Sequence, residues 1–171
     1  MKKVIILALV TVLYINASAQ QGFRIGAGLS VAAPVSNLDA YSIGVGVDVL
    51  GQYGLSDKFA ITADVGYTTL FTKAKNGNSL NIIPIRGGVR FYPTSQIYLG
   101  AKAGLGIITQ KNMNNQSNLA FGIGAGFKMD QKLDIGIAYE GVSFTTPAFG
   151  LTPANNASLG YISVRLGYFF N

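Results

Sequence analysis

The sequence contains no cysteine, no histidine and no tryptophan among its 171 residues. Without cysteine there is no disulfide scaffold, no thiolate metal site, no cysteine nucleophile and no cysteine to carry a lipoprotein anchor. Without histidine the chain lacks the commonest general base and the commonest metal ligand. These absences predict a protein that is not an enzyme and that carries no cofactor and no metal.

Charge is also scarce in this chain. Asp, Glu, Lys and Arg make up 12% of the residues, about half the share in an ordinary soluble domain. Glycine is abundant, with 22 residues. The composition therefore fits neither a polar globular protein nor a charged disordered chain, while the length fits one domain.

The first 19 residues have the pattern of a secretory signal peptide. Lys2 and Lys3 give a positive start, an apolar run covers 4–15, and the small residues Ala17-Ser18-Ala19 form a cleavage site. The apolar run is shorter than the roughly 20 residues that a membrane helix needs. We expect residues 1–19 to be removed on export, which leaves one domain, 20–171, with 11 basic and 7 acidic residues.

Alternation of apolar with small or polar residues runs through nearly all of 20–171, and it predicts β-strands. Each predicted strand is long enough for a tilted crossing of a bilayer, which takes about 9–11 residues. Glycine, asparagine and charged residues interrupt every later apolar stretch, so no second membrane helix is expected. The eight predicted strands are 22–32, 42–53, 59–71, 80–92, 97–109, 118–129, 133–144 and 159–170.

The connections between these strands alternate in length. Those at 33–41, 72–79, 110–117 and 145–158 are long, and those at 54–58, 93–96 and 130–132 are short. With eight strands, all long loops fall at one end, and the short turns and both termini fall at the other. Long loops outside and short turns in the periplasm are typical of a transmembrane barrel. We therefore predict an all-β fold, an eight-stranded antiparallel up-and-down transmembrane β-barrel.

The charged residues of the predicted strands all share the face of the small residues, and the opposite face is apolar and uncharged. A small, sparsely ionic face suits the narrow interior of an eight-stranded barrel. The apolar face would then meet lipid, where Lys or Arg at mid-bilayer would cost about 2–4 kcal/mol. The alternative is a soluble secreted binding barrel with the apolar face as its core. The ten predicted lumen residues are Arg24, Asp48, Asp64, Arg86, Arg90, Lys102, Lys128, Asp134, Glu140 and Arg165.

These ten residues are expected to form one ion-pair network across the interior. A turn at 130–132 makes Lys128 and Asp134 cross-strand partners, and the same register would place Asp48 opposite Asp64. Two facing carboxylates are destabilising, so a cation must lie beside them. The network has two interpretations, structural packing or a gate in a narrow ion path. Neighbouring strands supply three arginines for this place: Arg24, Arg86 and Arg165.

Three further features carry predictions. Pro84 lies within a predicted strand and cannot donate to the ladder, so we expect a bulge or a late strand start there. Lys73, Lys75 and Lys111 in the long loops are candidates for contact with lipopolysaccharide phosphates or a host surface, unless these loops are merely solvated. Aromatic residues form two interfacial belts on the apolar face. The belts are Phe23, Tyr53, Phe59, Phe91, Phe127, Tyr168 and Phe170 near the short turns, and Tyr67, Phe71 and Tyr139 near the long loops.

The chain resembles the small eight-stranded outer-membrane barrels of Gram-negative bacteria, the OmpA/OmpX type. The resemblance rests on the cleavage site, the hairpin rhythm over 20–171, and the end Leu166-Gly167-Tyr168-Phe169-Phe170-Asn171. That end is similar to the C-terminal signal read by the barrel-assembly machinery, here carried by Tyr168 and Phe170. The family often places Phe last, whereas Asn171 follows here.

The resemblance implies an integral protein of the outer membrane with a structural or surface-interaction role and no catalysis. The alternative is a narrow, porin-like ion or small-solute channel. Known outer-membrane barrel enzymes look like histidine-dependent catalysts, and this chain has no histidine. The implied partners are outer-membrane lipid, lipopolysaccharide, the barrel-assembly machinery and periplasmic chaperones. Nucleic acid is not expected, because the basic residues lie mostly on the predicted lumen face.

Overall fold

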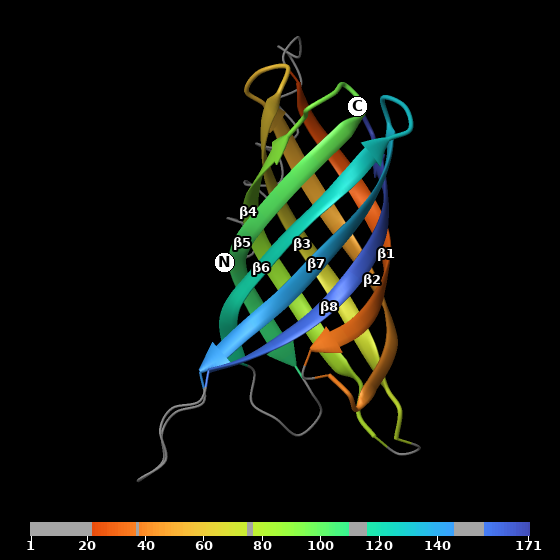
Figure 1. The fold of residues 1–171 in the computed structure, drawn as a ribbon, viewed down its shortest axis with the longest axis vertical. Helices are drawn as coiled ribbons and strands as arrows, with labels where there is room; N and C mark the ends of the chain where they lie inside the picture. Colours follow the sequence, from red (N-terminus) through yellow and green to blue (C-terminus); the bar gives the residue numbers. More distant parts are fainter. Residues whose placement is uncertain (1–21, 37, 75–76, 110–115, 146–155) are drawn as a thin grey trace, which may run out of the picture.

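A computed structural model of the chain describes residues 22–36, 38–74, 77–109, 116–145 and 156–171. These residues form a closed barrel of eight antiparallel strands in which each strand pairs with its sequence neighbours and β1 pairs with β8 (Figure 1). Within the described ranges, no helix is long and apolar enough to cross a membrane. The predicted signal peptide, 1–19, lies outside the described residues.

The eight predicted strands are confirmed, and their boundaries differ little from those expected. The largest difference is in β1, which continues past its predicted end at residue 32 to Ser36. This extension keeps pairing with β8, and the register shifts between Pro34 and Ser36. The strands are β1 Phe23–Ser36, β2 Tyr41–Gly54, β3 Phe59–Thr72, β4 Leu80–Phe91, β5 Ile97–Thr109, β6 Gln116–Lys128, β7 Leu133–Thr145 and β8 Asn156–Phe169.

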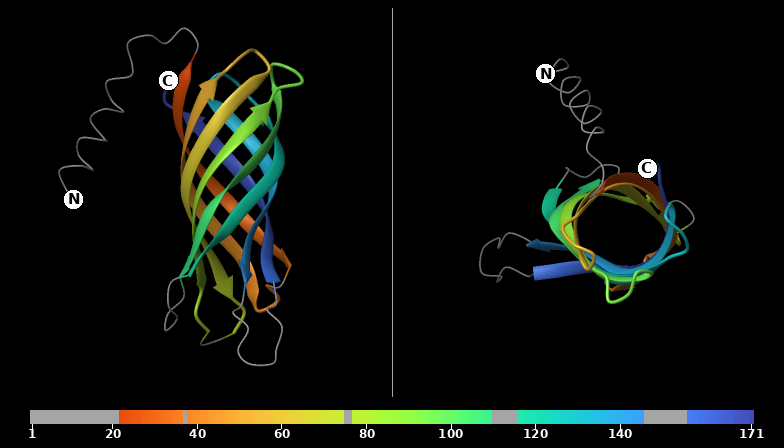
Figure 2. Two further views of the ribbon diagram at one scale, coloured as in Figure 1. Left: turned by 90° about the vertical axis from the view of Figure 1, so that its left-hand side faces the viewer. Right: turned by 90° about the horizontal axis from the view of Figure 1, so that it is seen from above.

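The two ends of the barrel differ as the loop lengths predicted. The turns at 55–58, 92–96 and 129–132 lie at one end, together with the C-terminal Asn171 (Figure 1 and the left view of Figure 2). Gly22 lies at the same end, because its carbonyl accepts a hydrogen bond from the Gly54 N–H at 3.4 Å. We call this the short-turn end and the opposite one the long-loop end. The view along the axis in Figure 2 shows the strands as a closed ring.

The apolar face of the strands is the outside of the barrel. Leu29 and Ile123 on this face are 66% and 64% exposed, whereas none of the ten strand charges is exposed. The soluble alternative, with the apolar face as a protein core, is therefore wrong for this chain. Aromatic rings lie on the outer surface at both ends, as predicted. The exposed ones are Tyr53, Phe59, Phe91, Phe127, Tyr168 and Phe170 near the short turns, and Tyr67 and Phe71 near the long loops.

The prediction for Pro84 is wrong in both of its forms. Strand β4 begins at Leu80, and its register with β3 is the same on both sides of the proline, so there is neither a late start nor a bulge. Proline has no N–H to donate to β3. The strand tolerates the residue because Pro84 still pairs with Gly106 of β5, and one irregular stretch of ladder toward β3 is enough to accommodate it.

The barrel closes at a seam between β1 and β8, and Asn171 extends that seam beyond the last strand residue. The Asn171 side-chain oxygen accepts a hydrogen bond from the Ile25 N–H at 3.0 Å, and its amide group donates to the Phe23 carbonyl at 2.9 Å. The Phe170 N–H donates to the Ile25 carbonyl at 2.9 Å. A side-chain amide thus takes the place of a main-chain partner at the end of the ladder.

Candidate functional site

The lumen of the barrel holds the charged strand residues, and glycine makes room for them. A Cβ built on Gly28 would collide with the Arg165 guanidinium, and one on Gly126 would collide with the Tyr98 ring. The interior of an eight-stranded barrel is only wide enough for side chains to fill. Large ionic and aromatic side chains therefore fit into the lumen at positions where the facing residue is glycine.

The first ionic cluster, which we call the Glu140 group, consists of Asp64, Arg86, Lys102 and Glu140. Arg86 bridges the two carboxylates, with its Nη2 2.7 Å from Asp64 Oδ2 and its Nη1 2.8 Å from Glu140 Oε2. The Lys102 ammonium lies 3.5 Å from Glu140 and 3.7 Å from Asp64. The Tyr161 hydroxyl donates to Glu140 at 3.1 Å. These contacts join five strands across the lumen, β3, β4, β5, β7 and β8.

The second cluster, the Asp134 group, consists of Asp48, Arg90, Asp134 and Arg165 and lies nearer the short turns. Arg165 contacts Asp48 at 2.8 Å and Asp134 at 2.9 Å, and Arg90 contacts Asp134 at 3.1 Å. Aromatic and amide side chains complete the group. Tyr98 donates to Asp134 at 3.3 Å, its ring lies 4.1 Å below the Arg90 guanidinium, and Gln52 accepts from both Arg90 and Tyr92.

A cavity of about 50 Å³ lies beside the two clusters. It is lined by Arg90 and Arg165 from one cluster and by Lys102 and Glu140 from the other, with glycines of β5, β6 and β7 as its wall. This volume holds one or a few water molecules, since a single buried water needs about 10–15 Å³ of such space. The middle of the lumen therefore contains a small chamber that charged side chains of both clusters and apolar residues line together.

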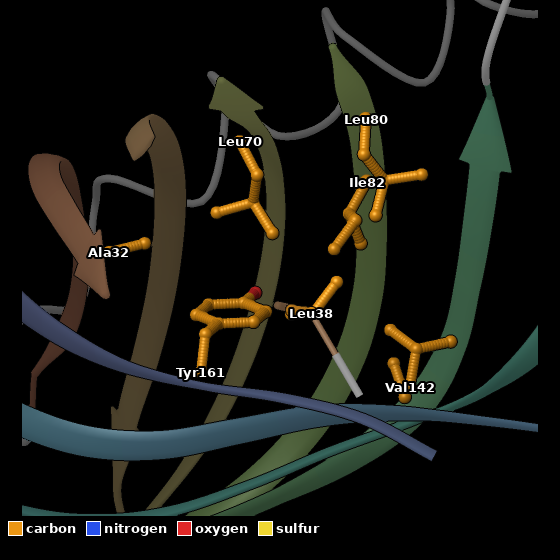
Figure 3. Packing of buried hydrophobic residues seen from close by; sticks show 8 residues of the cluster. Ala32, Leu38, Leu70, Leu80, Ile82, Val142 and Tyr161 are labelled. Atoms are coloured by element: carbon orange, nitrogen blue, oxygen red, sulfur yellow. The ribbon is translucent and has the colours of Figure 1, made fainter. Parts of the chain in front are cut away.

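Toward the long loops, the lumen is filled by an apolar plug. Its side chains converge on the barrel interior, including Leu38 from the segment between β1 and β2 (Figure 3). Leu70 and Ile82 are fully buried, and Tyr161 joins the plug to the Glu140 group through its hydroxyl. The plug residues are Ala32, Leu38, Leu70, Leu80, Ile82, Ala120, Val142 and Tyr161.

The predicted register of β2 and β3 requires correction. Asp48 lies opposite Gly66, and Asp64 lies opposite Leu50, so the two carboxylates do not face each other. The reason is the turn, in which the Leu55 N–H donates to the Phe59 carbonyl and centres the hairpin one residue later than expected. Asp64 instead lies directly opposite Arg86 of β4, and Asp48 reaches Arg165 of β8.

The structure also divides the lumen charges differently from the expected single network. Eight of the ten form the two separate clusters, and two lie outside them. Lys128 is opposite Asp134 in the β6–β7 register, yet its ammonium lies 4.5 Å above the Tyr92 ring. The Arg24 guanidinium lies 4.1 Å above the Phe169 ring. Arg90 and Arg165 both form ion pairs with the Asp134 carboxylate, and the Lys128 ammonium contacts the Tyr92 ring instead.

Several lumen residues were not identified from the sequence. Gln52, Tyr92, Tyr98 and Tyr161 all lie on the lumen face and hydrogen-bond to the ionic clusters or to one another. Their position on the charged face of each strand was the signal that could have found them. Leu38 could not be found in this way, because it lies in a loop, where the alternation of strand residues does not predict which way a side chain points.

Among the predicted loop contacts, only Lys73 falls within the described residues, where it is exposed directly after β3. Lys75 and Lys111 lie outside the described residues. At the other end, Asp130 shapes the β6–β7 turn. Its carboxylate accepts the backbone N–H groups of Leu133 and Lys132, and these hydrogen bonds lower the pKa of Asp130 below its ordinary value.

No group of three or more His, Cys, Asp or Glu side chains in the described part of the chain could hold a metal ion. Each carboxylate of the two clusters is instead neutralised by arginine or lysine. The chemistry that this arrangement supports is ion pairing across a narrow lumen.

Comparison with known proteins gives a family and a set of similar structures. The family model of the outer membrane protein beta-barrel domain matches residues 5–170. No curated protein sequence is similar enough to this chain to count as a match.

Solved structures with the same architecture share little sequence with this chain. The attachment invasion locus protein Ail of Yersinia pestis has a TM-score of 0.57 and 15% identity, and the alignment covers 86% of this chain and 97% of Ail. The N-terminal β-barrel domain of OprF from Pseudomonas aeruginosa has a TM-score of 0.57, 13% identity and coverage of 87% and 100%. Ail in complex with the heparin analogue sucrose octasulfate is also similar, with a TM-score of 0.50, 16% identity and coverage of 86% and 97%. At these identities the similarity shows the fold alone.

Proposed function

The chain belongs to the family of outer membrane protein beta-barrel domains, and from that premise we propose that it is a closed, non-catalytic barrel whose role is structural or lies in contacts made by its outer loops. The observation that carries this proposal is the filled lumen. The apolar plug occupies the long-loop end, and two ion-pair clusters occupy the middle. A solute would have to displace both.

The filled lumen argues against the alternative of a porin-like channel. Opening a path would separate Arg86 from two carboxylates and move the buried plug residues. Removing one partner from a buried ion pair costs about 3–5 kcal/mol. The cavity beside the two clusters is small, about 50 Å³, and is lined by charged side chains of both.

A liposome-swelling assay with small sugars tests the closed lumen. Proteoliposomes of the wild-type protein are expected to swell at the rate of protein-free liposomes. The double variant Leu70→Ala/Ile82→Ala, which removes much of the plug, gives the matched comparison. Swelling of the wild-type vesicles at the rate of a porin control would reject the closed barrel and support the channel.

We assign the long-loop end to the outside of the cell and the short-turn end to the periplasm. In that orientation Lys73, which is exposed directly after β3, lies at the outer end. Lys75 and Lys111 lie outside the described residues, in the sequence between β3 and β4 and between β5 and β6. The partners we propose for these three lysines are lipopolysaccharide phosphates or sulfated surface polysaccharides. The solved complex of Ail with sucrose octasulfate makes that compound a suitable probe. Lysine binds such groups as a point charge, so the contact depends on ionic strength.

The loop contacts are tested by binding of sucrose octasulfate and of lipopolysaccharide vesicles to the detergent-solubilised protein. Charge reversal of the three loop lysines is expected to abolish binding, and reversal of Lys58, an exposed lysine at the other end, is expected to leave it intact. Equal binding by both variants would leave the barrel with a structural role only.

The same proposal covers biogenesis. After removal of residues 1–19, periplasmic chaperones and the barrel-assembly machinery would receive the chain, with Tyr168 and Phe170 as the recognised end. These two rings lie on the outer face in edge contact, 5.8 Å apart, and are 44% and 58% exposed. Replacing both with alanine is expected to reduce the amount of assembled protein in the outer membrane without changing synthesis. Unchanged assembly would mean that the two rings only contact lipid and are not part of the recognised end.

A further inference from the structure

The lumen charges balance everywhere except at the short-turn end. The Glu140 group has two acids and two bases, and so has the Asp134 group. The two remaining strand charges, Arg24 and Lys128, are both cations, and both lie at the short-turn end of the barrel. The uncompensated positive charge of the interior is therefore concentrated at one mouth.

That mouth is a pocket of about 600 Å³, which we call the basic vestibule. Three cationic side chains line it, from β1, from β6 and from the β6–β7 turn. Amide side chains of two different turns add hydrogen-bond donors. The lining includes Arg24, Lys128, Lys132, Gln96, Gln131 and Asn171.

Aromatic rings support two of these cations, and Arg24 also donates a hydrogen bond from its Nε to the Asn171 main-chain oxygen at 3.4 Å. Arg24 lies over Phe169 at 4.1 Å, and Lys128 lies over Tyr92 at 4.5 Å. A cation–π contact is attractive but leaves the positive charge available to an anion. Among the described residues, no ion pair joins Arg24, Lys128 or Lys132 to a carboxylate side chain.

The one acidic side chain that lines the vestibule, Asp130, accepts hydrogen bonds from the backbone of its own turn. Asp130 accepts hydrogen bonds from the Lys132 N–H at 2.6 Å and the Leu133 N–H at 2.7 Å, so its carboxylate stabilises the turn. The side chains of the lining carry three positive charges and one negative charge, that of Asp130, so their net charge is positive.

We propose that the basic vestibule is a binding site for phosphate-class oxyanions. Arginine and lysine with amide donors beside them are the groups that bind such anions, arginine through paired N–H groups and lysine as a point charge. The volume falls within the range of about 300–1,000 Å³ typical of small-ligand pockets. The anion can be a soluble phosphate compound or the phosphate headgroup of a lipid of the adjacent leaflet, since both present the same chemistry.

Site-resolved lysine labelling tests this proposal on the wild-type protein. The protein is held in phosphate-free detergent micelles and treated with an amine-acetylating reagent, with and without inorganic pyrophosphate, and the modified peptides are quantified by mass spectrometry. At nine times the Kd, occupancy is 90%, so labelling of Lys128 and Lys132 is expected to slow about tenfold. Lys58 is the matched control, because it is exposed at the same end but does not line the vestibule.

A second arm distinguishes the two sources of the anion. The protein is reconstituted into vesicles of phosphatidylcholine alone or with phosphatidylglycerol, without pyrophosphate. Protection by pyrophosphate in micelles assigns the site to soluble phosphates, and protection only in phosphatidylglycerol vesicles assigns it to lipid headgroups. Equal effects on Lys58, or no protection in either arm, would overturn the proposal.

Variants separate binding from folding. Arg24→Gln is expected to abolish the protection, and Arg24→Lys is expected to restore most of it because the positive charge is kept. Both are first checked for the band shift between boiled and unboiled samples that marks a closed barrel. Full protection in a folded Arg24→Gln protein would also overturn the proposal. Lys73 does not enter this test, since it lies directly after β3 at the opposite end of the barrel.

Discussion

Replacing Arg86 by methionine isolates the contribution of the Glu140 group to the stability of the barrel. The Arg86 side chain is 5% exposed and donates three hydrogen bonds, two to Asp64 and one to Glu140. Methionine leaves both carboxylates buried with Lys102 as their only cation, at 3.5 and 3.7 Å. Breaking a buried ion pair in this way costs about 3–5 kcal/mol, and we expect a loss of that size in the free energy of unfolding.

A charge-balanced double variant shows whether the loss comes from unpaired charge. Arg86→Met/Asp64→Asn leaves one acid, Glu140, facing one base, Lys102. Because the two positions are in direct contact, the double variant is expected to be less destabilised than the sum of the single changes by about 1–3 kcal/mol. Lys58→Met, at an exposed position, should change stability by no more than about 0.5 kcal/mol.

Urea unfolding in phospholipid vesicles, followed by the band shift of unboiled samples, measures these differences. A loss below about 1 kcal/mol for Arg86→Met is what an exposed ion pair would give. That result would mean that water screens the Glu140 group, and it would refute the description of the lumen as closed.

Three other predictions concern the packing, the seam and a turn. Gly126→Ala places a Cβ against a tyrosine ring and should destabilise the barrel by about 1–3 kcal/mol, whereas Gly54→Ala, with nothing within 4 Å of the new Cβ, should be close to neutral in the same unfolding assay. Asn171→Ala removes two hydrogen bonds at the seam, so the Ile25 amide should exchange its hydrogen faster, and unchanged exchange would contradict the role given to Asn171. The Asp130 carboxyl should titrate below the ordinary pKa of an aspartate in carbon-detected NMR, because backbone hydrogen bonds of its own turn lower its pKa. Its stabilisation of the turn is then complete above the ordinary pKa and lost as the pH falls through the lowered pKa, and a titration at or above the ordinary value would show that the turn does not form as described.

The strand pattern could be predicted because a barrel in lipid imposes alternation on every strand. Charges at Asp64, Arg86 and Glu140 marked the lumen face, and the uncharged face marked the outside. The same alternation failed where a side chain leaves the strands. Leu38 enters the lumen from a loop, and only tertiary packing against Leu70 and Ile82 determines that position.

The pairing of individual charges was harder to predict than their face. A shift of one residue in the centre of the β2–β3 turn moves Asp48 two positions along its partner strand, from Asp64 to Gly66. The turn hydrogen bonds of Leu55 and Phe59 decide that centre, and neither residue type favours one turn strongly enough to show it in the sequence. Barrel closure made Arg165 one of three candidate cations for Asp48, and no local pattern selected among the three.

Conductance of the wild-type protein in planar lipid bilayers tests the closed lumen most directly. With the apolar plug and both ion-pair clusters in place, insertion should leave the membrane current at the level of the protein-free bilayer, and Leu70→Ala/Ile82→Ala should be the first variant to raise it. Stable, stepwise openings of the wild-type protein would contradict the closed barrel and establish a conducting lumen in its place.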